Sequence, residues 1–290
     1  MARSPTPPHS GNAVRWSNRR GKGTAIVIMD SKKRWRRAQR GEADCWEHVP
    51  VADPAYLARK HQFWLSVLGL LPPQVTAGRR VLDMGCGPSG VLATCQLGEE
   101  RVGVDPLMEH YLRLNPGLRA LPVTWEVGEV ETYQPREPFD LVISFNSLDH
   151  CYAPDAGARN PRACTRDGGY ALVSLNVHQR RLTCAYYRVA NRVIDPMHPH
   201  HWTASDVREL LCSCGFALVH EWDLSQHVAL LAGQTPRANG PKQPITRRLR
   251  HALNVPYWPI HVAAWLGYTV TPKLGARGTI ITPRLFLCQA

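Results

Sequence analysis

A glycine-rich turn carries the clearest chemical signal in the sequence. Residues 81–90 read VLDMGCGPSG, so that Gly85, Gly87 and Gly90 have the spacing G-x-G-x-x-G behind a short apolar run. Glycines at this spacing let the backbone turn sharply and approach a nucleotide without side chains in the way. Asp105 ends the next apolar run, where a carboxylate can accept hydrogen bonds from ribose hydroxyls. The pattern predicts a site for either a dinucleotide or S-adenosylmethionine.

Asp83, two residues before the first glycine, distinguishes between these two candidate ligands. A carboxylate at the end of the first strand points into the ligand site. Beside a pyrophosphate it would be repelled and would weaken binding. Beside the α-amino group and the sulfonium of S-adenosylmethionine it is favourable, partly by bracing the loop and partly through water. The spelling D-x-G-x-G therefore favours the methyl donor, and an NAD(P)-dependent oxidoreductase is the alternative.

Two histidines are candidates for the catalytic base. Methyl transfer is an in-line displacement at a sulfonium carbon, so the protein mainly supplies alignment and a dry pocket. A hydroxyl acceptor also needs a base, and histidine is the usual choice near neutral pH. His150 follows the fourth predicted strand, and His201 precedes a helix that faces the end of the fifth. Each is predicted as catalytic or substrate-binding, and a helix-capping or packed histidine is the alternative for each.

No metal site is predicted. The run HPHH at 198–201, with Asp195 before it, has suitable residue types. Pro199 stiffens that run, so its three imidazoles do not converge easily on one ion. Cys212 and Cys214 form the only close pair among nine cysteines, whereas structural zinc sites usually need two such pairs. An odd number of cysteines without framework spacing indicates reduced thiols.

Short apolar runs alternate with helical patterns between residues 80 and 224, and these elements must position the chemical groups. Strands are predicted at 80–85, 101–106, 123–129, 139–145, 170–177 and 216–224. A helix at 205–215 ends at Gly215. A last strand is predicted at 284–290, with 227–234 as the competing choice. This alternation indicates a parallel, doubly wound sheet, in which ligands bind at the carboxyl ends of the strands.

Two helices are predicted ahead of the first strand. Asp30 or Ser31 can cap the first, whose apolar residues fall roughly on one face. The second spans about 55–71 by the spacing of its apolar residues. The face of the first helix contains Trp35, Ala38 and Trp46. We interpret the tryptophans in both helices as packing residues.

The chain resembles the class I S-adenosylmethionine-dependent methyltransferases over residues 80–223. VLDMGCGPSG matches the first motif of that family, and GVDP matches its ribose-binding motif. GEVE resembles the segment that meets the adenine, and FDLVISFNSLDHC matches the fourth-strand motif. RDGGYALVSLNV and HPHHWTASDVRELLCSCGF resemble the segments that lead into the fifth strand and into the helix before the sixth. These features follow the family's order, which is more specific than any one motif.

The resemblance implies a fold, a cofactor and a set of site residues. The fold is α/β: a Rossmann-like, doubly wound, seven-stranded and mostly parallel sheet, with N-terminal helices and a C-terminal insertion before the last strand. The cofactor is S-adenosylmethionine. Asp105 would bind the ribose, Glu129 would lie near the adenine amino group, and the end of the fourth strand would meet both cofactor and acceptor. The implied cofactor residues are Asp83, Gly85, Gly87, Ser89, Asp105, Glu129, Ser144 and Asn146.

The sequence divides into five parts and departs from the family in two places. Pro161 lies in the helix between the fourth and fifth strands and is expected to kink it or end it early. An insertion of unusual length precedes the last strand. The predicted parts are a disordered basic extension at 1–28, a helical cap at 29–79, the core at 80–224, a basic aromatic insertion or lid at 225–283, and the last strand at 284–290.

Charge is placed unevenly along the chain. The formal net charge is +12, with +10 in residues 1–40, +8 in residues 224–290 and −6 between them. A nucleic-acid enzyme usually carries its basic surface on the folded core, so nucleic acid is disfavoured as a partner. The plainest interpretation of the insertion is a substrate lid with ordinary packing aromatics. Its combination of basic and interfacial aromatic residues is also typical of a membrane-surface segment, and aromatic plus arginine residues are also how single-stranded RNA is held. These residues are Arg247, Arg248, Arg250, Tyr257, Trp258, Trp265 and Tyr268.

The sequence as a whole predicts a methyltransferase that uses S-adenosylmethionine. The predicted reaction is O-methylation of a small molecule or a glycan intermediate. An oxidoreductase, or a non-catalytic methyltransferase-like partner subunit, is the alternative. The chain has no apolar run long enough to span a membrane and no signal-peptide pattern, which predicts a cytoplasmic protein with contact to an anionic membrane left open.

Overall fold

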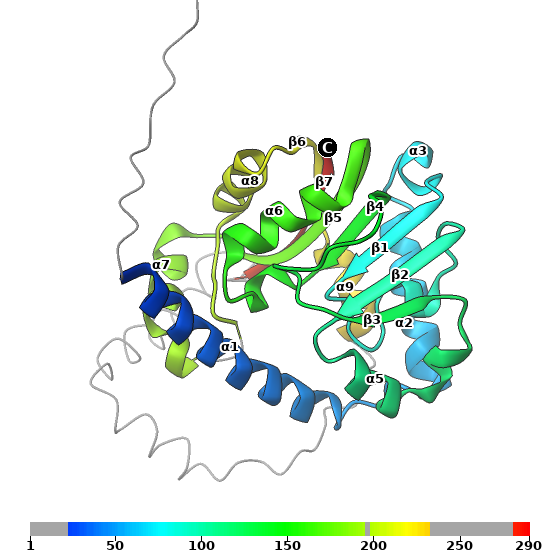
Figure 1. Ribbon diagram of the computed structural model, residues 1–290, viewed down its shortest axis with the longest axis horizontal. Coiled ribbons are helices and arrows are strands. Elements are labelled where there is room, and N and C mark those ends of the chain that lie inside the picture. The colour runs from blue at the N-terminus through cyan, green and yellow to red at the C-terminus, as the bar shows by residue number, and fades with distance from the viewer. Residues whose placement is uncertain (1–22, 195–197, 233–280) are drawn as a thin grey trace, which may run out of the picture.

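The computed structural model describes residues 23–194, 198–232 and 281–290, and its elements alternate as the sequence predicts (Figure 1). The helices are α1 (Gly23–Trp46), α2 (Pro54–Leu68), α3 (Pro73–Thr76), α4 (Val91–Thr94), α5 (Met108–Leu114), α6 (Pro154–Cys164), α7 (Arg181–Ile194), α8 (Ala204–Ser213) and α9 (Ser225–Ala232). The strands are β1 (Arg80–Met84), β2 (Glu100–Asp105), β3 (Thr124–Val127), β4 (Phe139–Phe145), β5 (Thr165–His178), β6 (Ala217–Asp223) and β7 (Ile281–Gln289). Short 3₁₀ turns lie at Pro116–Ala120 and Leu148–His150.

The strands form one seven-stranded sheet in the order β3-β2-β1-β4-β5-β7-β6. All neighbours pair in parallel except β7, which is antiparallel to both β5 and β6. The order reverses direction between β1 and β4, which is where ligands bind in doubly wound sheets. The predicted Rossmann-like, mostly parallel sheet is confirmed. Its last strand is β7, and the competing segment at 227–234 instead contributes to α9.

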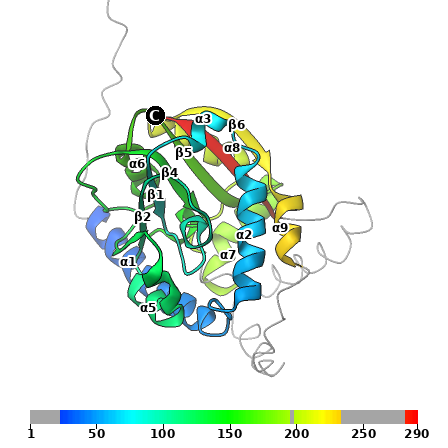
Figure 2. The ribbon, with the colours of Figure 1, turned by 90° about the vertical axis from the view of Figure 1, so that its right-hand side faces the viewer.

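Two apolar cores cover the two faces of the sheet because successive residues of a strand point to opposite sides. Val81 of β1 belongs to one core, whereas its neighbour Leu82 belongs to the other. The same alternation separates Leu287 from Phe286 in β7. Helices α2, α4 and α9 pack on the Val81 face, where Figure 2 shows α2 and α9 side by side. Helices α6 and α8 pack on the opposite face.

Helix α1 crosses the carboxyl ends of the strands (Figure 1). It begins at Gly23, earlier than the predicted cap at Asp30 or Ser31, because no glycine or proline interrupts the chain between Gly23 and Asp30. Residues 1–22, most of the predicted disordered extension, lie outside the described residues. Trp35 and Ala38 are buried, as expected for one packed face.

The two predicted departures from the family have different outcomes. Pro161 lies inside α6, and the helix continues past it to end at Cys164. The helix therefore does not end at Pro161 but three residues after it. Pro161 has no backbone N–H to donate to the preceding turn of the helix. The insertion begins with α9 and ends at β7, and residues 233–280 lie outside the described residues. Among the helices described, none is long and apolar enough to cross a bilayer.

Candidate active site

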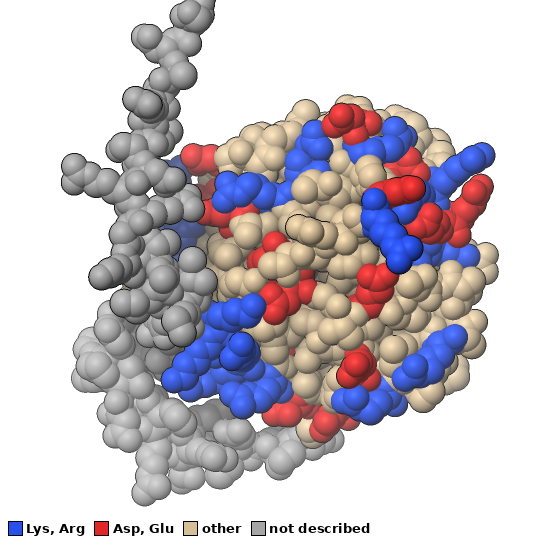
Figure 3. Space-filling model, viewed as in Figure 1, with Lys and Arg blue, Asp and Glu red and all other residues tan. Residues whose placement is uncertain are grey.

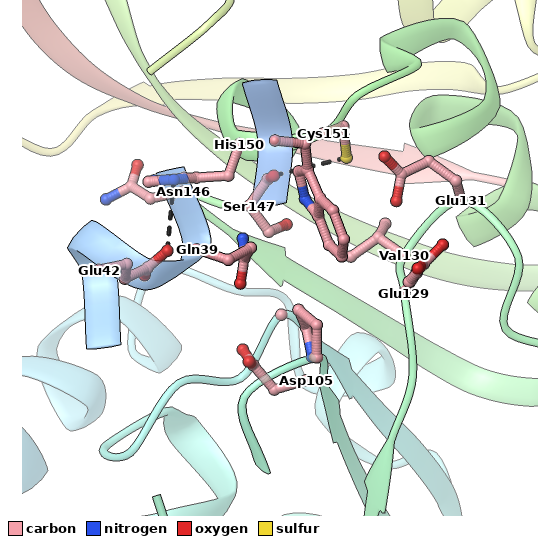
Figure 4. Close-up of a pocket in the computed structure, with 13 residues that line it drawn as sticks. Gln39, Glu42, Asp105, Glu129, Val130, Glu131, Asn146, Ser147, His150 and Cys151 are labelled. Atoms are coloured by element: carbon pink, nitrogen blue, oxygen red, sulfur yellow. Dashed lines mark hydrogen bonds and ion pairs between the residues drawn. The ribbon is translucent and has the colours of Figure 1, made fainter. Parts of the chain in front are cut away.

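Two adjoining cavities lie at the carboxyl ends of β1, β2 and β4. The larger has a volume of about 490 Å³, within the range of small-molecule sites, and is walled by the glycine turn, α1, α2 and α9. The smaller is walled by α1 and the loops after β2, β3 and β4 (Figure 4). The residues that line both are Glu42, Gly85, Asp105, Asn146 and His150. The shared lining indicates one elongated site with two compartments.

The glycine turn has the geometry that its sequence predicts. Gly85 and Gly87 have φ angles of +70° and +58°, in the left-handed region that side chains disfavour. A Cβ atom at Gly85 would lie 2.4 Å from the Cβ of Ser147, so close packing also requires glycine there. A Cβ atom at Gly87 would meet nothing within 4 Å. The backbone at Gly87 therefore borders open space in the larger cavity, where a ligand can approach it.

Asp83 is a buried carboxyl at the end of β1 and lines the larger cavity. Burial raises its pKa to about 7, and the nearby Asp105 adds to this shift. The backbone amides of Leu92 and Val91 and the Lys60 ammonium oppose it. Within the described structure its Oδ2 atom has no hydrogen-bond partner. A cationic group in the cavity would therefore stabilise the ionised form.

Asp105 ends β2 and lines both compartments. Its Oδ2 accepts a hydrogen bond from the Gly87 N–H at 3.1 Å, and its Oδ1 accepts one from the Leu107 N–H at 2.8 Å. Burial raises its pKa to about 7, and the Glu42 carboxylate adds to the shift. Each carboxylate oxygen can accept a further bond, so the fixed carboxyl fits a ligand with neighbouring hydroxyls.

Glu129 lines the smaller compartment, where α1 and the loop after β4 hold it in place. Its Oε2 accepts hydrogen bonds from Lys32 Nζ at 3.1 Å and from the Tyr152 hydroxyl at 3.0 Å. The Trp35 ring meets Tyr152 edge-on, with the ring centroids 5.6 Å apart. The predicted adenine-side acid is thus at the cavity, with two partners from this chain already on one oxygen.

The predicted polar residues at the end of β4 lie at different depths. Asn146 lines both compartments and has a φ of +48°, a left-handed conformation that asparagine tolerates better than most residues. Ser144 is fully buried, its hydroxyl bonds to that of Ser147, and it lines neither compartment. The prediction of Ser144 as a cofactor ligand is therefore not supported by its position. Side chains alternate along a strand, which turns Ser144 away from the face that Phe145 presents to the larger compartment.

The structure separates the two candidate histidines. His150 lines both compartments, and its Nδ1 lies 3.5 Å from Glu42 Oε2 (Figure 4). His201 is buried, and its Nδ1 lies 3.1 Å from His178 Nε2. Its backbone carbonyl accepts a bond from Arg188 Nε, and the residue lines neither compartment. Only His150 has the position of a catalytic group, and the expectation for His201 is corrected to a packed, hydrogen-bonded histidine.

Comparison with known proteins decides between the ligands that the turn can hold. The model of a methyltransferase domain family matches residues 55–221, more than half of the chain. The chain belongs to this methyltransferase family. This is a family of class I methyltransferases with S-adenosylmethionine as the cofactor, which removes the oxidoreductase as an alternative.

Curated relatives of the methyltransferase match only part of their own length. The chain is 33% identical over 104 residues to the ubiquinone biosynthesis O-methyltransferase of Rhodopseudomonas palustris strain BisB18, covering 34% of this chain and 40% of that protein. It is 33% identical over 105 residues to the enzyme of the same name from Bordetella avium strain 197N, covering 33% and 42%. The matches thus span about two fifths of these relatives.

Solved structures share the fold of the methyltransferase. The YcgJ protein of Bacillus subtilis superposes with a TM-score of 0.52 at 15% identity, covering 79% of this chain and 97% of that one. The phosphoethanolamine N-methyltransferase 2 of Haemonchus contortus, solved with S-adenosylmethionine, gives 0.53 at 19% identity, covering 78% and 51%. At these identities the likeness shows the fold alone.

The site of the methyltransferase fits its cofactor. S-adenosylmethionine bears an ammonium and a sulfonium, and the two buried carboxyls Asp83 and Asp105 face the larger compartment. The open space beside Gly87 leaves room for a ligand against the turn. A phosphate at this turn would meet two carboxyls, so the electrostatics agree with the family match.

Three side chains near the site have the types and spacing of metal ligands. One ligand atom each of Asp149, His150 and His198 lies within 4.8 Å of the other two. This differs from the HPHH run considered in the sequence, because His200 Nε2 instead pairs with the carbonyl of Cys151 at 2.8 Å. One carboxylate and two imidazoles can hold a divalent ion. The group adjoins the larger compartment through His150 and His198.

Sequence reasoning missed the site residues that come from the N-terminal helices. Glu42 of α1 lines both compartments, and Lys60 and Trp64 of α2 line the larger one. Ser89 lines it too, but its hydroxyl pairs with Tyr56 and its carbonyl accepts from Trp64, so its polar groups hold α2. The sequence did contain a signal for Lys60 as a site residue. Lys60 lies four residues before Trp64 and therefore on the same, otherwise apolar, face of the helix.

The buried carboxyls predict a pH-dependent stability. The folded-state pKa values of Asp83 and Asp105 are raised from 3.8 to about 7. Between those limits the folded state binds more protons than the unfolded state, so these groups make the free energy of unfolding fall as pH rises. Asp83→Asn should raise the melting temperature of the ligand-free enzyme more at pH 8 than at pH 5. A difference that does not change with pH would contradict the buried, unpaired carboxyl.

Proposed function

We propose that the methyltransferase methylates an oxygen of a small, largely apolar acceptor. The observation that carries the proposal is the position of His150 between the two compartments with Glu42 beside it. Nδ1 faces the carboxylate, which favours the tautomer that carries its proton on Nδ1 and leaves Nε2 to accept one. A base at this position suits a hydroxyl acceptor. The curated relatives are O-methyltransferases, which supports the same choice.

The larger compartment supports an apolar acceptor over a glycan. Beyond the glycine turn one part of its wall is aromatic and aliphatic. Such a surface binds an aromatic or aliphatic body by burial. The polar side chains of the compartment lie beside it and can orient a hydroxyl: Glu42, Lys60, Asn146, His150, Ser174, Asn176 and His198. The residues that form the apolar part of the wall are Phe63, Trp64, Phe145, Leu224, Val228 and Leu231.

The proposed roles of the chain's residues follow from their positions. When bound, the cofactor supplies an electrophilic methyl group. Asp105 would bind the ribose hydroxyls, Glu129 would lie on the adenine side, and Asp83 would stabilise the ammonium. His150 would hold the proton that the acceptor hydroxyl loses, and Glu42 would stabilise the resulting imidazolium. The apolar wall excludes water from the reacting groups.

A set of matched acceptors tests the proposal. The enzyme is incubated with S-adenosylmethionine and an alkylcatechol, the corresponding alkyl arylamine, or an alkyl glycoside, and formation of S-adenosylhomocysteine is measured. Turnover is expected with the catechol and not with the amine or the glycoside. Methylation of the amine or the glycoside alone would refute the proposed acceptor class while leaving the methyltransferase assignment intact.

The outer face of α1 supports contact with an anionic membrane. Four exposed cations recur along it with helical spacing: Lys33, Arg36, Arg37 and Arg40. Among the described residues none of them forms an ion pair, and Figure 3 shows a cluster of basic side chains over this helix. The opposite face of α1 lines the active site. The sequence-predicted basic aromatic residues at 247–268 lie outside the described residues.

We expect the enzyme to float with anionic vesicles at low salt and not with neutral ones. Each cation near an anionic surface contributes about 1 kcal/mol, and salt screens it. Glutamate at the four α1 positions should lower the bound fraction about tenfold or more. Glutamate at four exposed arginines elsewhere, Arg79, Arg113, Arg119 and Arg136, is the control for net charge. Equal losses in both variants, or binding to RNA but not to vesicles, would contradict membrane contact through α1.

A further inference from the structure

Lys60 stands out among the charged residues of the larger compartment. It is the one lysine or arginine in the described lining, where the other charged side chains are Glu42, Asp83 and Asp105. The cofactor brings two cationic groups, which suit the carboxyls, and one carboxylate, which does not. That carboxylate needs a cation or several hydrogen-bond donors to leave water. Lys60 is the cation that this wall offers.

Two hydrogen bonds fix the helix that carries Lys60. Tyr56, Lys60 and Trp64 are spaced four residues apart and therefore share one face of α2. The Tyr56 hydroxyl lies 3.0 Å from Ser89 Oγ, and Trp64 Nε1 donates to the Ser89 carbonyl at 3.2 Å. Both bonds go to the glycine turn, one on each side of Lys60. The lysine is thus held on the face of α2 that looks over the turn.

The surroundings of Lys60 favour an anionic partner. Its ammonium lies 5.8 Å and 5.9 Å from the ring centroids of Phe63 and Trp64, so rings replace part of its hydration. Burial lowers the pKa of Lys60 to about 8, and the Asp83 carboxylate opposes the shift. Asp83 is therefore near enough to act on Lys60, yet within the described structure no ion pair joins them. Lys60 and Asp83 thus carry opposite charges and line the same compartment without pairing. A ligand group with both an ammonium and a carboxylate can pair with each of them.

We propose that Lys60 binds the carboxylate at the amino-acid end of the cofactor, opposite Asp83, which takes the ammonium. The amino-acid end of the cofactor would then bridge Lys60 and Asp83 and replace the water that each charged group loses on burial. This assignment rests on the cofactor and not on the proposed oxygen acceptor. It makes α2, which lies before the first strand, part of the cofactor site.

Calorimetry with two ligands tests the assignment without any methyl transfer. S-adenosylhomocysteine keeps the carboxylate, and its decarboxylated analogue lacks only that group. The wild-type enzyme should bind the first about tenfold or more tighter, as for a hydrogen bond to a charged group. Lys60→Met should lose that preference by weakening S-adenosylhomocysteine alone, and Lys60→Arg should keep part of it.

Matched controls separate binding from packing. Lys32→Met removes a cation from the adenine side of the site and should change both affinities by the same factor. Melting temperatures show whether each variant is folded. Equal weakening of both ligands by Lys60→Met would mean that Lys60 only supports the wall. Unchanged affinity for S-adenosylhomocysteine, with or without a loss for a carboxylate-bearing acceptor, would also overturn the assignment.

Discussion

His150→Ala is expected to lower turnover by about 10²–10⁴, with little change in cofactor affinity, as for loss of a general base. His150 lines both compartments, and Glu42 lies 3.5 Å from its Nδ1. Glu42→Gln keeps the shape of that partner and removes its charge, so it should lower turnover by a smaller factor. The measurements are steady-state turnover with a hydroxyl acceptor and calorimetry with S-adenosylhomocysteine.

His201→Gln is the matched control for this experiment. His201 pairs with His178 and lines neither compartment, so its replacement should lower the melting temperature and leave turnover per folded molecule near the wild-type value. Loss of turnover in the His201 variant alone would place the base elsewhere. Wild-type turnover in both variants would leave packing as the only role for either histidine.

Asp105→Ala is expected to weaken binding of S-adenosylhomocysteine by about 1.5–3 kcal/mol, because the lost hydrogen bonds to the ribose involve a charged partner. The carboxyl is fixed by the Gly87 and Leu107 amides, so the ligand finds it already oriented. A ligand without the ribose 2′ and 3′ hydroxyls should bind the wild-type and variant enzymes alike. Calorimetry measures all four affinities.

The exposed Asp167 provides the control for this carboxyl, since Asp167→Ala removes a charge far from both compartments. It should leave both affinities unchanged. An equal loss with and without the ribose hydroxyls in Asp105→Ala would mean that the carboxyl supports the turn and does not bind the ribose.

The sheet was predictable from the sequence because its signals are local. Each strand of the core is an apolar run of the right length, and the turn at Gly85 and Gly87 requires left-handed backbone that glycine supplies. The choice of the last strand, between residues 227–234 and residues 284–290, could not be made from local signals. Both segments are apolar enough, and pairing with β5 and β6 selects Ile281–Gln289.

The site was only partly predictable because its walls come from distant segments. Asp83, Gly85 and Asp105 follow from the strand pattern, since they lie at or just after the carboxyl ends of β1 and β2. His150 and His201 were equivalent in the sequence, and docking of the loops brings only the first to the cavity. Lys60 reaches the site because α2 is hydrogen-bonded to the glycine turn. The sequence shows a charged residue in the apolar stripe of a helix, but not the tertiary contact that brings that helix to the turn.

The position of β7 has a consequence for the order in which the protein folds. β6 pairs in the described sheet with β7 alone, and β7 also closes the open side of β5. During synthesis β6 and α8, which packs against it, emerge well before β7 and have no strand to join. Until residues 281–289 insert, β5 presents an unpaired edge that can capture another chain. We therefore expect insertion of β7 to be a late, non-local step, and nascent chains to be most prone to aggregation just before it.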